Sequence, residues 1–262
     1  MTPREEGIEA ARQSADDVLH RFGVREPSHI KPEAFASFMG VTVVDGQLDG
    51  ARARLTRGKK PQIRISERTP SPAARKFSIA HELGHHVMNH FGDKPHAFCE
   101  EHVPGRVRSY KIRDAEAEAQ AFAAGILMPR TLIATRCAEM EPSFESFQWI
   151  ARDFATSLPA SAIRYAEFSR EACQVVLSTN GAVTWAFPNK TFKTRIARGR
   201  KLDERTDAYA RGHGNAHPLH ARTLPASAWI DTTDDTEIVE HSTIIPEGGV
   251  LSLLWLRSRL SI

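Results

Sequence analysis

The stretch FSIAHELGHHVMNH, residues 77–90, constrains this chain more than any other part of its sequence. His81 and His85 are four residues apart. On a helix they lie about 40° apart around the axis, so both imidazoles can reach one ion from the same side. Glu82 borders that side directly after the first histidine. The spacing therefore requires a helix and predicts a metal site on it.

The residues before the motif supply a start for that helix. Ser71 is a good N-cap residue, and Pro72 suits the first helical position. We predict a helix over about residues 72–90. His86 and His90 are also four apart, but they lie about 100° further round the helix and have no acid directly after the first of them. We expect these two to point away from the site as exposed or capping residues.

A second helix is predicted over residues 115–128, where EAEAQAFAAGILM is rich in helix formers and is followed by a proline. Its candidate ligands are Glu116 and Glu118, which lie about 200° apart, so one of them can face the metal. Glu116 is on the apolar stripe of this helix and is the predicted third ligand. Gln120 is on the same side, and we expect it to hydrogen-bond a metal ligand. The stripe comprises Ala119, Phe122, Ala123 and Ile126.

These residue types have separate chemical roles. A zinc ion held by three protein ligands keeps a fourth position for water and lowers the pKa of that water to roughly 7. The carboxylate of Glu82 can take a proton from that water without occupying the metal. The sequence therefore predicts hydrolysis, with Glu82 as the acid and base.

HELGH followed by EAEAQAFAAGILMP resembles the ImmA/IrrE family of bacterial metallopeptidases. The resemblance covers roughly residues 30–135. It implies zinc, with manganese as the alternative ion, bound by His81, His85 and Glu116. Gln120 departs from the Asn or Asp that the family usually carries there. The resemblance also implies a zincin-like fold and a protein substrate, a helix-turn-helix transcriptional repressor whose cleavage relieves repression of phage, mobile-element or stress-response genes.

The remaining patterns predict an α+β chain in three parts. A zinc peptidase domain over residues 1–138 adds an N-terminal helix, a short helix over 32–39 and a small antiparallel sheet. A helix-turn-helix-like segment follows over residues 139–170. The third part, residues 171–262, is predicted to be a mostly β domain for sensing or substrate docking. Asn180-Gly181 marks a hairpin in it, and further strands are expected at 227–230, 237–241 and 250–256.

Composition excludes several classes of protein. The chain has 35 basic and 32 acidic residues, a net charge of +3 that gives no indication of nucleic-acid binding. No apolar run approaches the roughly 18 residues of a membrane span, and the first residues lack the apolar segment of a secretory signal. Three widely spaced cysteines argue against a disulfide framework. We expect a cytoplasmic protein that does not bind membranes.

Other polar groups are weaker candidates. The loop predicted over residues 91–114 contains three residues that could stabilise an oxyanion, and the sequence does not choose between them: Tyr110, Arg113 and His102. A second metal could be bound by His96, Cys99 and His102, although a solvated loop is the favoured interpretation. We expect a flexible loop around His213, His217 and His220, and no nucleophilic role for Cys137.

Two functions other than repressor cleavage are compatible with these patterns. The first is a DNA-binding regulator with a structural or vestigial metal site, suggested by the helix-turn-helix-like segment. Its second helix has Arg164 as its one cation before Arg170, which is little for reading bases. The second is hydrolysis of cell-wall or small peptides, which the lack of a secretory signal disfavours.

Overall fold

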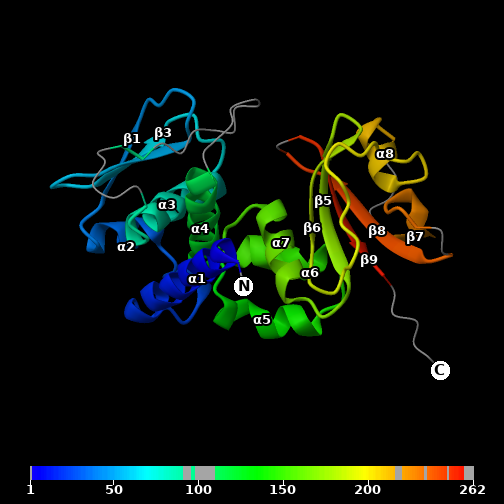
Figure 1. Cartoon of the computed structure of the whole chain (residues 1–262), viewed down its shortest axis with the longest axis horizontal. Coiled ribbons are helices and arrows are strands. Elements are labelled where there is room, and N and C mark those ends of the chain that lie inside the picture. The colour runs from blue at the N-terminus through cyan, green and yellow to red at the C-terminus, as the bar shows by residue number, and fades with distance from the viewer. Residues whose placement is uncertain are drawn as a thin grey trace. The chain divides into compact units, whose positions relative to one another are not determined.

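A computed structural model describes residues 2–90, 96–97, 110–215, 220–232, 235–246 and 248–256, with the backbone alone for 96–97 and 110–113 (Figure 1). The chain divides into two compact units. The first contains Met1–Leu132 and Asp153–Thr156, and the second contains Ile133–Arg152 and Ser157–Ile262. The predicted domain boundaries near residues 138 and 170 stay predictions. Among the helices of the described ranges, none offers the long apolar run that crossing a bilayer requires.

The first unit opens with the long helix α1, Pro3–Arg21. The Thr2 hydroxyl accepts a hydrogen bond from the Glu5 amide, and the Glu5 carboxylate accepts one from the Thr2 amide. This reciprocal cap satisfies amides that a helix start leaves without partners. The buried stripe of α1 was predicted from helical spacing and consists of Ala11, Ala15, Val18 and Leu19. The 3-10 turn Pro27–His29 and the helix α2, Pro32–Phe38, come next.

The small sheet of the first unit has the strand order β1-β3-β2-β4. Its strands are β1, Thr42–Gly46; β2, Ala53–Thr56; β3, Gln62–Ser66; and β4, His96–Ala97. The prediction that this sheet is antiparallel is wrong for one pair, because β1 and β3 are parallel. The reason is topological: the chain reverses once between β1 and β2 and again in the β2–β3 hairpin, so β3 runs in the same direction as β1, with which it pairs.

The helices α3, Pro72–Val87, and α4, Tyr110–Leu127, complete the first unit and lie side by side (Figure 1). The predicted start of α3 is confirmed, since the Ser71 hydroxyl accepts a hydrogen bond from the Ala74 amide. α3 ends three residues before the predicted His90. α4 begins at Tyr110, inside the stretch predicted to be a loop.

The second unit contains most of α5, Arg130–Glu139, all but the end of α6, Glu145–Asp153, and α7, Leu158–Phe168. α6 and α7 occupy the two helical patterns predicted for the helix-turn-helix-like segment. α7 starts at Ser157, whose hydroxyl accepts a hydrogen bond from the Ala160 amide. α5 was not predicted, because its sequence has no clear apolar stripe.

A five-stranded sheet forms the centre of the second unit, with the order β6-β5-β9-β8-β7 and antiparallel neighbours throughout. The predicted hairpin at Asn180-Gly181 is confirmed, with φ of +52° and +73° at these residues. The fold class is likewise confirmed as α+β with a mostly β C-terminal region. The strands are β5, Cys173–Thr179; β6, Ala182–Pro188; β7, Arg222–Pro225; β8, Glu237–Ile244; and β9, Val250–Trp255.

One strand prediction in this unit is wrong. Residues 227–230 do not form a strand, because β7 ends at Pro225 and the chain turns into the 3-10 helix Ala226–Ala228. The turn carries Trp229 into the core, where its side chain is 1 % exposed. A short helix, α8, Asp207–Gly212, contacts β8 and was not predicted.

Glu240 of β8 is fully buried where α8 meets the sheet. Its Oε1 accepts hydrogen bonds from the Ala208 amide and the Ser242 hydroxyl, both at 2.7 Å. Its Oε2 accepts from the Asp207 amide at 3.1 Å and from the Trp229 indole N–H at 3.0 Å. Burial raises the pKa of Glu240, and these donors oppose that rise. The carboxylate therefore ties α8 and the turn around Trp229 to the sheet.

We predict that Glu240→Gln destabilises the second unit by about 2–4 kcal/mol. An amide NH₂ in place of either oxygen faces a backbone N–H that then has no acceptor. All four tryptophans lie in this unit, so denaturant unfolding followed by tryptophan fluorescence measures it directly. Glu237→Gln, at an exposed position on the same strand, is the control, and equal stability of the two variants would contradict the prediction.

Candidate metal centre

The helix α3 brings the two predicted histidine ligands together. His81 and His85 are 8 % and 0 % exposed, and their Nε2 atoms are 3.2 Å apart. Two imidazole nitrogens at this distance repel through their lone pairs unless a proton or a cation lies between them. The two nitrogens are therefore placed either to share a proton or to hold one cation between them.

The third predicted ligand comes from α4. Oε2 of Glu116 lies 3.3 Å from His81 Nε2, and Oε1 lies 3.7 Å from His85 Nε2. One ligand atom from each of the three residues falls within 4.8 Å of the others. The structure thus brings together the three residues that the sequence assigns to the metal.

The donor spacing fits a zinc ion. Zinc lies about 2.0–2.1 Å from nitrogen and oxygen ligands in a tetrahedral site, so its ligand atoms are about 3.3 Å from one another. The two shortest separations, 3.2 Å between the histidines and 3.3 Å from His81 to Glu116, match that spacing. Two imidazoles and a carboxylate would leave one position open, as in catalytic zinc sites. This group could therefore bind a metal.

Close packing of α3 on α4 positions the carboxylate. A Cβ atom at Gly84 would lie 3.1 Å from the Phe122 ring and 3.2 Å from the backbone of Ala119. The glycine of HELGH therefore lets the two helices approach closely. The predicted apolar stripe of α4 is fully buried in this region and consists of Ala119, Phe122, Ala123 and Ile126.

The surroundings of His85 keep its imidazole neutral. Burial, followed by the neighbouring His81, His90 and Arg57, lowers the pKa of His85 to about 2. Arg57, which follows β2, also donates a hydrogen bond to the backbone carbonyl of His85 and another to Asn89, both at 2.6 Å. A neutral imidazole has the lone pair that a metal requires.

The expectation that His90 points away from the site is wrong. His90 Nδ1 lies 2.9 Å from His85 Nδ1, and its Nε2 lies 2.8 Å from Glu118 Oε2. The physical reason is that α3 ends at Val87, so helical spacing does not apply to residue 90. Asn89 has a φ of +51° and turns the chain back. The amide of His90 then donates to the carbonyl of His85.

Two other predicted site residues occupy different environments. Glu82 is fully buried on α3 beside the histidine ligands, and a carboxylate removed from water is stabilised by a nearby cation. The predicted contact of Gln120 with a metal ligand is not seen, because its side chain is exposed. Gln120 lies a full turn, about 6 Å, along α4 from Glu116.

Several weaker candidates fall outside what the structure describes. These are the side chains of Tyr110, Arg113 and His96, and the residues Cys99, His102 and His217.

Two other weak candidates are described by the structure. The His213 ring stacks on Tyr209, with 4.0 Å between ring centroids. Burial raises the pKa of Cys137 to about 12, so this thiol is protonated and unreactive, as expected.

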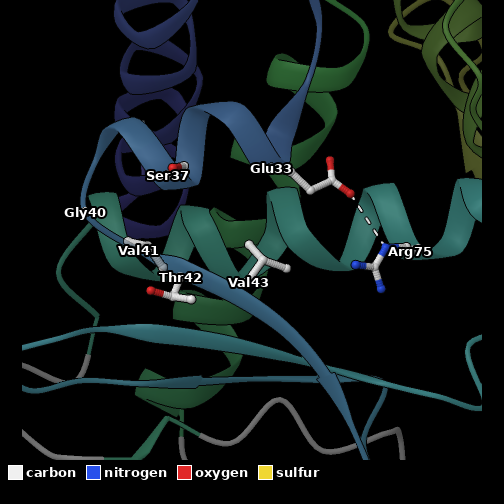
Figure 2. A pocket seen from close by; sticks show the side chains of 7 residues that line it. All are labelled: Glu33, Ser37, Gly40, Val41, Thr42, Val43 and Arg75. Carbon is white, nitrogen blue, oxygen red and sulfur yellow. Dashed lines mark ion pairs between the residues drawn. The ribbon is translucent and has the colours of Figure 1, made fainter.

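A pocket of about 390 Å³ lies elsewhere on the first unit, between α2, β1 and the start of α3 (Figure 2). None of the described metal-site residues lines it. Arg75 enters it and is paired with Glu33 at 3.6 Å and with Asp45. The two carboxylates more than balance the charge of Arg75, so this arginine does not favour an anionic ligand in the pocket.

Removal of the third ligand tests the centre. We predict that Glu116→Ala weakens zinc binding by more than about 100-fold, because loss of an outer contact to a ligand alone costs about 10- to 100-fold. Competition with a chromophoric zinc chelator measures the affinity. Gln120→Ala, on the exposed side of the same helix, should stay within about twofold of the wild type. Unchanged affinity in Glu116→Ala would refute this ligand set.

Widening the helix contact is a second test. Gly84→Val should destabilise the protein by about 1–3 kcal/mol through overpacking and should weaken zinc binding by moving α4 outward. Circular dichroism during denaturant unfolding and the same chelator competition measure the two effects. Gly212→Val is the matched control, since a Cβ at Gly212 meets no atom within 4 Å. Wild-type zinc affinity in Gly84→Val would contradict the prediction.

Comparisons with known proteins agree with this centre. Residues 37–165 match the model of the peptidase M78 family, described as an IrrE N-terminal-like domain. No curated protein matches the chain closely enough to count as a relative. A solved Mycobacterium tuberculosis transcriptional regulator has a similar fold, with a TM-score of 0.58 and 16 % identity over 94 % of this chain and 87 % of that one. At this identity the similarity concerns the fold alone.

The matched segment contains the metal-binding group His81, His85 and Glu116 together with Glu82, and the family is one of peptidases. Residues 37–165 of this chain therefore belong to the IrrE N-terminal-like domain family and form a metallopeptidase-like domain, as the two sequence motifs predict.

Proposed function

We propose that this protein is a zinc-dependent endopeptidase that hydrolyses a peptide bond in a protein partner. The observation that carries the proposal is the convergence of two imidazole nitrogens and a carboxylate at 3.2–3.7 Å beside a fully buried glutamate. Zinc is the proposed ion because the spacing fits its tetrahedral geometry, and manganese is the alternative. Membership of residues 37–165 in a peptidase family supports the same reaction.

The residues of the site have distinct roles in this proposal. His81, His85 and Glu116 hold the metal, which would supply a polarised carbonyl and a water of lowered pKa. Glu82 takes a proton from the attacking water and passes it to the amide nitrogen as the C–N bond breaks and the new C–O bond forms. Glu82 is fully buried, so bulk water does not compete for its carboxylate, and it directly follows His81 on α3.

The proposed partner is a helix-turn-helix transcriptional repressor in the cytoplasm. This rests on the resemblance of the two motifs to the ImmA/IrrE family. Cleavage would relieve repression of phage, mobile-element or stress-response genes. The fold that this chain shares with a protein named as a transcriptional regulator is compatible with a regulatory role. The second unit would serve docking or sensing.

A DNA-binding regulator is the competing function, suggested by the layout of α6 and α7. The second helix of such a motif presents cations to the groove. In α7, however, Arg164 is 6 % exposed, bonded to Glu167 at 2.6 Å and stacked on Phe168. Tyr165 is fully buried on the same helix. α7 therefore packs into its own unit with residues that a recognition helix would expose, and this observation disfavours the alternative.

Glu82→Gln separates metal binding from catalysis. We predict that the variant keeps zinc affinity within about threefold of the wild type and loses at least about 100-fold in cleavage rate, because an amide does not accept the proton. Zinc competition and gel-based cleavage of a repressor substrate measure the two properties. Glu139→Gln, an exposed position on α5, should cleave normally. Full activity in Glu82→Gln would refute the assigned role.

The partner is tested with the regulator encoded beside the gene for this protein. Incubation with the purified chain should yield two fragments, and a chelator should prevent their formation until zinc is restored. The DNA-binding alternative would be favoured if the regulator stayed intact with and without chelator and this protein bound DNA with an affinity that falls steeply as salt is added.

A further inference from the structure

A chain of three polar side chains leads away from the metal centre. His85 Nδ1 lies 2.9 Å from His90 Nδ1, and His90 Nε2 lies 2.8 Å from Glu118 Oε2. The side chains of His90 and Glu118 are 9 % and 19 % exposed. By contrast, His81 Nδ1 has no hydrogen-bond partner among the described residues. The two histidine ligands are therefore supported differently.

Only one arrangement of protons satisfies both hydrogen bonds between His85, His90 and Glu118 when His85 binds a metal through Nε2. His85 then carries its proton on Nδ1 and donates it to His90 Nδ1. His90 consequently carries its own proton on Nε2 and donates it to the carboxylate of Glu118. Each hydrogen bond fixes the direction of the next, and the negative charge at the far end favours this order.

We propose that His90 and Glu118 are positioning residues that hold His85 in the tautomer and ring orientation required for metal binding. This inference deepens the proposed function and rests on the metal centre described above. A carboxylate that acts on a ligand through an intervening imidazole raises the basicity of that ligand and restricts its rotation. It thereby fixes the site before the metal arrives.

The position of Glu118 depends on α1. A Cβ atom built on Gly7 would lie 2.2 Å from Glu118 Oε1 and 2.8 Å from its carboxyl carbon. The carboxylate thus occupies the space that any other residue at position 7 would fill. α1 precedes residues 37–165, so the support of the metal centre extends beyond the matched segment.

Gly7 offers a sharp test, because a methyl group there displaces the end of a flexible side chain rather than backbone. Gly7→Ala should keep or increase the stability of the metal-free protein, since alanine in a helix is favoured over glycine by roughly 1 kcal/mol. If Glu118 had a packing role alone, Gly7→Ala would not change the metal affinity. If Glu118 is a positioning residue, Gly7→Ala should weaken metal binding without loss of stability.

The experiment measures zinc affinity of the full chain by chelator competition, with the visible spectrum of bound Co²⁺ as a second readout of coordination. We expect Glu118→Gln and His90→Phe each to weaken zinc binding about 10- to 100-fold, and Gly7→Ala to weaken it by a smaller factor. The double variant Gly7→Ala/Glu118→Gln should bind no more weakly than Glu118→Gln, because both changes remove the same contact. His86→Gln is the matched control and should stay within about twofold of the wild type.

Each result decides a definite point. Affinities within twofold of the wild type in folded Glu118→Gln and Gly7→Ala would overturn the positioning role while leaving the metal centre intact. Additive losses in the double variant would also overturn it. If the wild-type chain binds neither zinc nor Co²⁺, the proposed function fails together with this inference. Gly7→Ala keeps the test valid even if His90→Phe does not fold.

Discussion

The contact between α3 and α4 is the interaction on which the metal centre depends. α3 supplies two nitrogen ligands with the geometry that helical spacing imposes, but their Nε2 atoms at 3.2 Å form a site only when a third donor comes within the same few ångströms. Glu116 does so because Gly84 has no side chain and Ala119 opposite it has a small one. The three donor residues can therefore come together only if α3 and α4 pack closely at Gly84.

Helical spacing allowed much of this centre to be predicted. His81, His85 and Glu116 lie inside regular helices, where the angle between residues follows from their separation. His90 was misplaced because it lies after the end of α3, where a positive φ at Asn89 returns the chain toward His85. Gln120 was misplaced because spacing gives the direction of a side chain but not its distance from the end of the helix at which the ligands meet.

The second unit shows a different limit of sequence patterns. The hairpin at Asn180-Gly181 was predictable, since positive φ at two successive residues favours that pair. The turn at residues 226–228 was not, because its course is set by a long-range contact from Trp229 to Glu240. In the sequence, Glu240 is also indistinguishable from an ordinary exposed glutamate, although its buried carboxylate accepts four hydrogen bonds. Alternation of polar and apolar residues does not reveal such tertiary partners.

The glycines of the first unit connect these observations. Gly84 lies between α3 and α4, a Cβ at Gly125 of α4 would lie 2.8 Å from Ala15 of α1, and Gly7 of α1 leaves room for Glu118. Glycine within a helix is unfavourable by roughly 1 kcal/mol relative to alanine, so three such positions on touching helices indicate close packing across α1, α4 and α3. The order of these helices is also the order of the polar chain, from the carboxylate beside α1 to the histidine ligand on α3. The hydrogen bonds of Glu118 and His90 therefore connect the side of α4 that faces Gly7 of α1 with His85 on α3.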